Sequence, residues 1–214
     1  REASLVAGHS LGEFVALYAA EVFELTTVLK LIIRRSKLMT ECQGGAMTAV
    51  MGFDRKQLED LIAATEDVVI ANDNSSSQVV LSGSPKAVNL VSSQIKCKRA
   101  ISLPVSGAFH SPFMSEAANL FAKDLDNVIF SNAKIPVLSN SDPTPSCEGK
   151  LLKQRLKRQM VEGVRWREIM EKMSDSGIKT VVEIGPGNVL TGLVKRSIQG
   201  VVTSQLSNAA DLGH

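Results

Sequence analysis

The sequence predicts an α/β fold whose parallel-sheet core is interrupted by a small inserted subdomain. Three observations lead to this prediction. A short apolar stretch, a glycine-flanked turn and a helical pattern follow one another at residues 4–20. In the second half of the chain, helical and short apolar segments alternate, as they do around parallel sheets. Between these regions, residues 46–103 have the pattern β-α-β-β-α-β.

The first element is a strand, a tight turn and a helix around the pentapeptide Gly-His-Ser-Leu-Gly at residues 8–12. The stretch before it is apolar and strand-like, and the helix after it carries Phe14, Leu17 and Tyr18 at helical spacing. In this context a G-x-S-x-G sequence indicates a nucleophile elbow, so we expect an α/β-hydrolase-like core. An ordinary glycine-rich loop is the alternative.

Ser10 is therefore the candidate nucleophile. It would lie at a helix N-terminus, where free N–H groups and the helix dipole favour developing negative charge. The backbone N–H of Leu11 is placed to donate to an oxyanion. We expect the turn to require glycine at positions 8 and 12, because Cβ atoms at both positions would collide there.

The second helix is expected at residues 26–40, where Arg35 interrupts an apolar stripe. The stripe consists of Val28, Leu31, Ile32 and Met39. A guanidinium is costly to bury without an anionic partner. We therefore expect Arg35 to contact a carboxylate, which belongs either to the protein or to a substrate.

The inserted segment has strand patterns at residues 46–51, 68–71, 78–82 and 99–103. Its helices are expected to begin after Asp54 and Ser84, and the polar run 72–77 is expected to be a turn. This β-α-β-β-α-β order is the ferredoxin-like motif. We therefore expect a ferredoxin-like subdomain at residues 45–104, and a catalytic core formed by residues 1–44 and 105–214.

A serine nucleophile needs a base, and the chain has three histidines. His9 is the neighbour of Ser10 on the turn, and His214 ends the chain, where order is least expected. His110 therefore remains as the candidate base, although alone it would be interpreted as a structural loop histidine. Because His110 lies mid-chain, the hydrolase order Ser, acid, His is not met. We expect a dyad whose histidine is held by a backbone carbonyl or an amide.

The remaining strands are expected at residues 135–138 and 180–184, and Gly-Pro-Gly at 185–187 is expected to be a tight turn. Between the strands, a helix carries a run of basic side chains: Lys150, Lys153, Lys157, Arg155 and Arg158. Such runs are usually a solvated face. A docking surface for an acidic partner protein is the alternative.

Composition limits the class of protein. The 214 residues are 44% apolar, and no apolar run approaches the ~20 residues of a membrane span. The net charge of +2 gives no argument for nucleic-acid binding. Three cysteines without C-x-x-C spacing indicate free thiols in a reducing compartment. We expect an intracellular protein without a metal, a membrane or a nucleic-acid partner.

Together these residues resemble the malonyl-CoA:acyl carrier protein transacylase family. The resemblance is carried by Gly-His-Ser-Leu-Gly-Glu at 8–13, Arg35 twenty-five residues after the serine, Gly-Ala-Phe-His-Ser at 107–111, and Glu-Ile-Gly-Pro-Gly at 183–187 with Val-Leu-Thr-Gly-Leu at 189–193. It covers nearly the whole chain in the family's order and spacing.

The resemblance implies that Ser10 takes a malonyl group from malonyl-CoA. The phosphopantetheine thiol of acyl carrier protein then removes it, in fatty acid biosynthesis. Arg35 matches the arginine that binds the malonyl carboxylate, and Gln159 the glutamine whose main-chain carbonyl orients the histidine. Phe109 matches a position where a bulky residue accompanies malonyl rather than methylmalonyl. The family implies no cofactor, a monomer, and a cytoplasmic location, or the plastid stroma in a eukaryote.

The resemblance also implies an N-terminal region before Arg1, with a Gly-Gln-Gly loop that supplies a second oxyanion N–H. One lost oxyanion donor typically costs about a hundred- to a thousandfold in rate. We therefore expect this chain to be a fragment with low activity by itself. Three alternatives remain: a serine hydrolase or thioesterase, an acyltransferase domain of a polyketide synthase, and a non-catalytic fragment that contacts a carrier protein.

Overall fold

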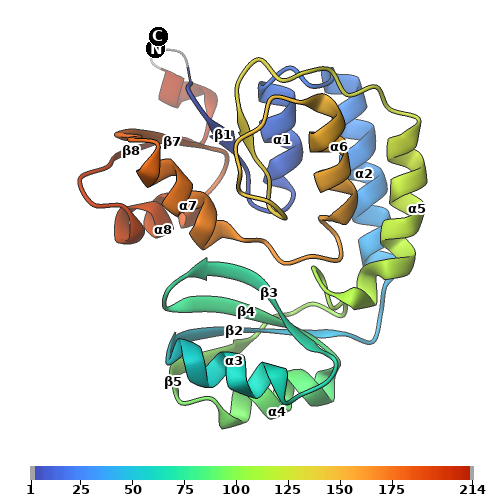
Figure 1. The fold of residues 1–214 in the computed structure, drawn as a ribbon, viewed down its shortest axis with the longest axis vertical. Helices are drawn as coiled ribbons and strands as arrows, with labels where there is room; N and C mark the ends of the chain where they lie inside the picture. The colour runs from blue at the N-terminus through green and yellow to red at the C-terminus, as the bar shows by residue number, and fades with distance from the viewer. Residues whose placement is uncertain (1–2, 213–214) are drawn as a thin grey trace. The chain divides into compact units, whose positions relative to one another are not determined.

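The computed structural model describes residues 3–212 and forms two compact units, Arg1–Trp166 and Arg167–His214 (Figure 1). The predicted mixed α/β architecture is confirmed, since the described residues contain both parallel and antiparallel strand pairs. The candidate residues on the first two helices and on the loops that pack against them belong to the first unit.

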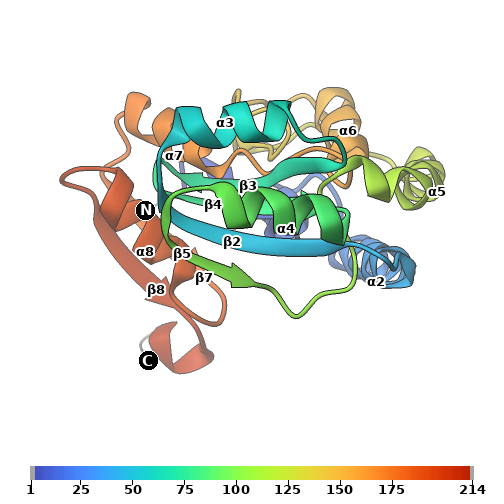
Figure 2. The same ribbon diagram turned by 90° about the horizontal axis from the view of Figure 1, so that it is seen from below.

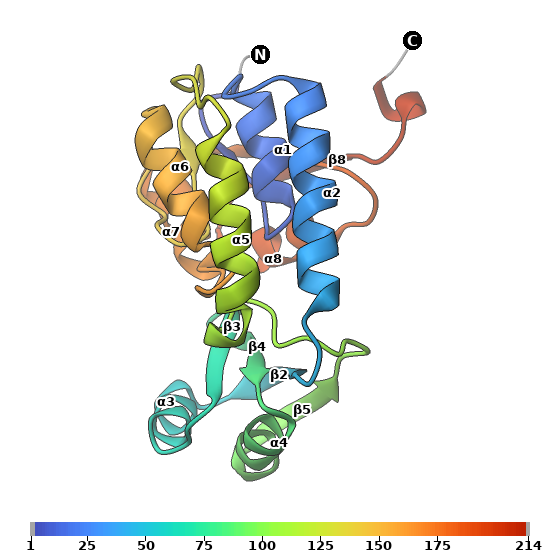
Figure 3. The ribbon, with the colours of Figure 1, turned by 90° about the vertical axis from the view of Figure 1, so that its right-hand side faces the viewer.

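In the first unit, a short parallel strand pair is accompanied by a layer of four helices. The pair consists of β1 (Val6–Ala7) and β6 (Val137–Leu138). The helices are α1 (Gly12–Ala19), α2 (Leu25–Glu41), α5 (Ser115–Asp126, preceded by the 3-10 turn Pro112–Met114) and α6 (Gly149–Arg158). Figure 3 shows the four helices side by side, and their facing sides form one apolar core. That core includes Phe14, Leu17, Leu31, Phe121, Leu125 and Leu152.

The apolar stripe of α2 is confirmed. Val28, Leu31 and Met39 are buried, and Arg35 is buried among them with 3% of its surface exposed. Tyr18 was expected on the buried side of α1, but it is 40% exposed. The buried apolar stripe of α1 is therefore narrower than the sequence pattern indicates. Phe14, Ala16 and Leu17 are the buried apolar residues of this short helix.

The inserted segment forms a four-stranded antiparallel sheet in the order β3-β4-β2-β5. Its elements are β2 (Ala46–Phe53), α3 (Arg55–Ala63), β3 (Val68–Ser75), β4 (Gln78–Gly83), α4 (Pro85–Gln94) and β5 (Cys97–Ser102). Figure 2 shows α3 and α4 on one face of the sheet, where Val50, Leu58 and Leu81 form a second core. Both expected helix starts are confirmed, because the side chains of Asp54 and Ser84 accept backbone N–H bonds.

The expected turn at residues 72–77 is wrong in its extent. Strand β3 continues to Ser75, and the turn is confined to Ser76 and Ser77. The polar residues of this strand bond to other segments: Asn72 bridges Val164 in parallel, and the Asn74 Oδ1 atom lies 2.8 Å from the His9 Nε2 atom. Tertiary contacts therefore keep the strand extended against the local turn preference of Asn and Ser.

The second unit contains a parallel pair, β7 (Thr180–Ile184) with β8 (Val202–Leu206). Its helices are α7 (Trp166–Asp175, which begins at the last residue of the first unit), α8 (Val189–Ser197) and the 3-10 turn Ala209–Leu212. The turn at residues 185–187 is confirmed, with φ of +132° at Gly185 and +88° at Gly187. The Glu183 carboxylate accepts the N–H groups of Leu190 and Thr191 in the first turn of α8. A side chain of the protein therefore already caps this helix start.

Within residues 3–212, no helix is long and apolar enough to cross a membrane. The same residues hold no cluster of His, Cys, Asp and Glu side chains that could bind a metal ion. Cys42, Cys97 and Cys147 are free thiols. His214, which the sequence interpretation set aside as a base, lies outside the described residues.

Candidate active site

Ser10 lies on a sharp turn between β1 and α1, with φ of +52°. This left-handed conformation is unusual for a residue with a side chain and is the strained geometry of a nucleophile elbow. The structure requires glycine at Gly8, where a Cβ atom would lie 1.9 Å from the Gly12 carbonyl oxygen. The same expectation for Gly12 is wrong, because a Cβ atom there would point into space with no neighbour within 4 Å.

The elbow is held by Asn140, a residue that the sequence analysis did not identify. Its Oδ1 atom accepts the Ser10 N–H at 2.7 Å, and its Nδ2 atom donates to the Gly8 carbonyl at 2.7 Å. Asn140 follows β6, the strand that pairs with β1, and it is 1% exposed. Because it is 130 residues from Ser10, no local pattern links the two.

The side chain of His110 faces the Ser10 hydroxyl, and the side chain of His9 does not. The His110 Nε2 atom is 2.8 Å from the Ser10 Oγ atom, and Nδ1 is 2.8 Å from the main-chain oxygen of Gln159. A carbonyl oxygen can only accept, so Nδ1 carries the proton and Nε2 accepts from the serine hydroxyl. His9 instead bonds to Asn74 and lies against the ring of Trp166.

The environment of His110 keeps its ring neutral. Burial, and after it the nearby Arg35 charge, lower the pKa of His110 from 6.5 to about 4. The Gln159 carbonyl acts in the opposite direction. At neutral pH the imidazole is therefore free to accept a proton from Ser10.

Arg35 contacts the same serine oxygen. Its Nη2 atom is 3.0 Å from the Ser10 Oγ atom, and its Nε atom donates to the Gln159 Oε1 atom at 3.0 Å. Its guanidinium also lies over the Phe14 ring, 5.6 Å from the centroid. Burial lowers the pKa of Arg35 to about 10, and the charge of Glu13 opposes this shift. The guanidinium remains protonated at neutral pH.

Among the described residues, Arg35 has no direct ion pair with a carboxylate of the protein, which was one of its two expected partners. Glu13 is close enough to act through its charge, but the side chain of Gln159 stands between them. The Gln159 Nε2 atom donates to the Glu13 Oε2 atom at 2.8 Å. The family resemblance implied only a carbonyl contact for Gln159, and no sequence pattern indicated a role for Glu13.

Leu11 and Phe109 flank the reacting side chains in sequence. Leu11 precedes α1, and within the described part of the chain its N–H has no hydrogen-bond partner. Phe109, next to His110, is half-buried and packs against the helical core. Gly107 makes room for this ring, because a Cβ atom there would lie 2.5 Å from the Phe109 Cε1 atom.

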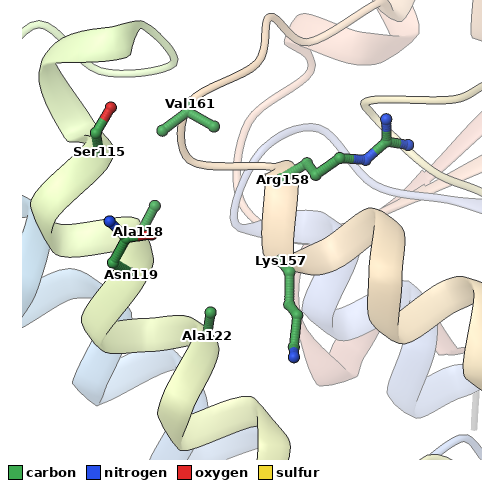
Figure 4. A pocket seen from close by; sticks show the side chains of 7 residues that line it. All are labelled: Ser115, Ala118, Asn119, Ala122, Lys157, Arg158 and Val161. Atoms are coloured by element: carbon green, nitrogen blue, oxygen red, sulfur yellow. The ribbon is translucent and has the colours of Figure 1, made fainter.

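A separate cavity of about 420 Å³ lies between α5 and α6 (Figure 4). It is lined by Ser115, Ala118, Asn119, Ala122, Lys157, Arg158 and Val161. Its two cations have partners in the fold, since Lys157 pairs with Asp126 and Arg158 with Glu162. Neither Ser10 nor His110 lines this cavity.

The basic run on α6 is only partly a solvated face. Arg155 is 2% exposed and pairs with Asp142 at 2.7 Å, so it belongs to the interior. Lys153 donates to the main-chain oxygens of Asp126 and Val128. Helical spacing placed Arg155 beside the lysines, but it pairs in the interior with a carboxylate on the loop that leads into α6.

A serine on a strained elbow, with a histidine at its hydroxyl, is the arrangement of enzymes that transfer acyl groups through a serine. The chain belongs to the acyl transferase domain family, whose match covers residues 1–213.

Among its relatives are malonyl CoA-acyl carrier protein transacylases. The Synechocystis protein of that name is 46% identical over 207 residues, which are 97% of this chain and 71% of the relative. The polyketide biosynthesis malonyl CoA-acyl carrier protein transacylase PksC of Bacillus subtilis is 40% identical, over 89% of this chain and 68% of its own length.

Solved structures of malonyl transacylases also match this chain. The crystal structure of the Synechocystis malonyl-CoA:ACP transacylase matches with a TM-score of 0.97 and 45% identity, over 99% of this chain and 72% of that one. A type II polyketide acyl-carrier protein in complex with its malonyl-transacylase matches with a TM-score of 0.88 and 33% identity, over 99% of this chain and 71% of that one.

Proposed function

We propose that this acyltransferase moves the malonyl group of malonyl-CoA to the phosphopantetheine thiol of acyl carrier protein, through a malonyl ester of Ser10. One observation carries the proposal: the Ser10 Oγ atom is 2.8 Å from the His110 Nε2 atom and 3.0 Å from the Arg35 Nη2 atom. A base and a buried cation therefore meet at one hydroxyl. This is what a nucleophile for an acyl group with a free carboxylate requires.

In the first half-reaction, the Ser10 oxygen attacks the thioester carbonyl while His110 Nε2 takes the hydroxyl proton. The Leu11 N–H is placed to stabilise the oxyanion of the tetrahedral intermediate. The intermediate collapses, the C–S bond breaks, and the coenzyme A sulfur leaves with the proton from His110. The Gln159 carbonyl holds the ring by its Nδ1–H throughout and stabilises the transient imidazolium.

In the second half-reaction, the carrier-protein thiol gives its proton to His110 and its sulfur attacks the malonyl ester. The ester C–O bond breaks, and Ser10 recovers the proton from His110. A thiol rather than water is the acceptor, which distinguishes this reaction from that of a hydrolase or thioesterase. Those alternatives also use the serine and the histidine, but they give the buried Arg35 no task.

Arg35 is proposed to pair with the malonyl carboxylate. This pairing places an anion where the protein supplies no direct ion pair to the guanidinium, and it offsets the charge that opposes protonation of His110. Phe109 is proposed to limit the space beside the acyl group, which favours malonyl over methylmalonyl. One methyl group is worth only ~1–3 kcal/mol in such a pocket, so this preference is partial.

The second substrate is proposed to be acyl carrier protein. The relative solved as a complex with an acyl-carrier protein supports this assignment. The enzyme is proposed to act as a monomer, as the family resemblance implies. Fatty acid biosynthesis is the expected role, and polyketide biosynthesis is the second candidate, because two polyketide transacylases are 40% identical to this chain.

The division of the chain also remains a proposal. We infer a ferredoxin-like subdomain at residues 45–104 inserted into an α/β-hydrolase-like core of residues 1–44 and 105–214. The strand order β3-β4-β2-β5 and the two helices on one face support the first part. The parallel β1–β6 pair with the elbow at its end supports the second.

Intact-protein mass spectrometry after incubation with malonyl-CoA tests the function. With an incubation long enough for slow transfer, the unmodified chain is expected to gain one malonyl group, which acyl carrier protein then removes. Ser10→Ala and His110→Ala are each expected to abolish the gain. Ser93→Ala removes an exposed serine on α4 and serves as the matched control. Unchanged acylation of Ser10→Ala would contradict the proposal.

A further inference from the structure

We propose that Glu13 is a positioning residue of the acyl-transfer site, which acts through the side-chain amide of Gln159 to orient the guanidinium of Arg35. The inference rests on the proposed function, because its consequence is selection of the malonyl carboxylate. Glu13 lies in the first turn of α1, three residues after Ser10, and 1% of its surface is exposed.

The contacts of Glu13 lead to the site and not to solvent. Its Oε2 atom accepts from the Gln159 Nε2 atom at 2.8 Å and from the Asn140 N–H at 3.2 Å. Its Oε1 atom is buried without a hydrogen bond in the described structure, although the Ser139 hydroxyl lies close enough to lower the pKa of Glu13. An incompletely paired carboxylate inside a protein is a cost to folding, and burial raises the pKa of Glu13 accordingly. A site role accounts for a charge that packing does not require.

Glu13 determines which way the Gln159 amide faces. A carboxylate only accepts, so the Nε2 end of the amide must point toward Glu13, and the Oε1 end then points toward Arg35. Nε2 also donates to the Ser10 carbonyl at 2.9 Å. With the amide reversed, an NH2 group would face the guanidinium, and two donors would meet in a buried space.

The oxygen end of the amide then orients Arg35. The bond from Arg35 Nε to Gln159 Oε1 fixes the plane of the guanidinium, which turns Nη2 toward the Ser10 Oγ atom. A long, flexible arginine side chain would otherwise lose this orientation to other rotamers. The chain of contacts from Glu13 to Gln159 to Arg35 therefore presents the cation beside the nucleophile.

Two substitutions separate the hydrogen bond from the charge. Glu13→Gln keeps the length and one oxygen acceptor, which the Asn140 N–H holds in place, and it removes the charge. Glu13→Asp keeps the charge and withdraws the oxygen from Gln159 by one methylene. The measurement is the ratio of kcat/KM for malonyl-CoA to that for acetyl-CoA. We expect Glu13→Gln to stay within about threefold of the unmodified enzyme and Glu13→Asp to lose about tenfold, as loss of one charged hydrogen bond implies.

Glu183→Gln is the matched control, because it removes a half-buried carboxylate that caps α8 and bonds to none of these residues. It should leave the ratio unchanged. An unchanged ratio in Glu13→Asp overturns the inference, as does a fall of about tenfold in Glu13→Gln, since the charge and not the hydrogen bond would then act. Failure of the unmodified enzyme to form malonyl-Ser10 is a separate result, which overturns the proposed function instead.

Discussion

At the scale of single residues, the site is organised around one oxygen atom. The Ser10 hydroxyl faces a neutral histidine and a protonated arginine. Each of these groups has a disadvantage when it is considered alone. A buried histidine with a low pKa is a weak base, but the serine lies within hydrogen-bond distance of it. A buried cation is costly, but it attracts an anionic acyl group and the developing negative charge on oxygen. We therefore expect the pair to favour substrates that bring their own carboxylate.

Arg35→Ala is expected to remove this preference. Charge-assisted hydrogen bonds contribute ~1.5–3 kcal/mol, so malonyl transfer should fall about ten- to a hundredfold. Acetyl transfer should stay equal or rise, because acetyl leaves the cation unpaired. Arg35→Lys should fall between, since Lys cannot donate two parallel N–H bonds. Competition between malonyl-CoA and acetyl-CoA gives the kcat/KM ratio, and an unmoved ratio in Arg35→Ala would show that Arg35 is only structural.

At the scale of elements, the elbow depends on the close approach of one glycine to the helix that follows. A Cβ atom on Gly8 would overlap the Gly12 carbonyl at 1.9 Å, whereas one on Gly12 meets nothing. The two glycines of one motif therefore have different physical roles. The first allows the turn itself, and the second begins α1.

Gly8→Ala and Gly12→Ala form a matched pair that tests this difference. Gly8→Ala should lower the free energy of unfolding by about 3 kcal/mol or more, because the backbone must shift to admit the methyl group. Gly12→Ala should change it by less than about 1 kcal/mol, since alanine is the better helix former. Urea denaturation followed by circular dichroism measures both. Equal losses of unfolding free energy in the two variants would contradict this difference between the glycines.

At the scale of the whole molecule, the buried histidines link stability to pH. The pKa of His110 is lowered to about 4 in the fold, and burial also lowers the pKa of His9. Below pH 6.5 the unfolded chain binds protons that the folded chain does not, so stability falls as the pH falls. Burial of Glu13 raises its pKa and acts in the opposite direction.

Comparison with His110→Gln isolates the histidine at the nucleophile. Between pH 6.5 and pH 4, its shift corresponds to about 3 kcal/mol of lost stability, and the variant should lose less over the same range by this amount. Urea denaturation at a series of pH values measures the difference. Parallel curves for the two proteins would show that His110 titrates as freely in the fold as in the unfolded chain.

The sequence by itself predicted most local elements of this protein and the side chains that meet at the Ser10 hydroxyl. The G-x-S-x-G turn, the stripe that buries Arg35 and the helix starts at Asp54 and Ser84 follow from spacing over a few residues. Elimination among three histidines led to His110, which the structure places at the serine. The Gln159 carbonyl came from a family resemblance, and no local pattern indicated it.

Tertiary structure alone decided what surrounds these side chains. Asn140 reaches the elbow across 130 residues, and Glu13 meets Gln159 across 146. The extended backbone of Asn72 and Asn74 likewise depends on distant partners, and the burial of Arg155 on an ion pair with the loop before α6. Periodicity reports only the neighbours along a helix or strand. Hydrogen bonds in a buried site are satisfied by whichever groups the packing brings near, and those groups leave no local signature.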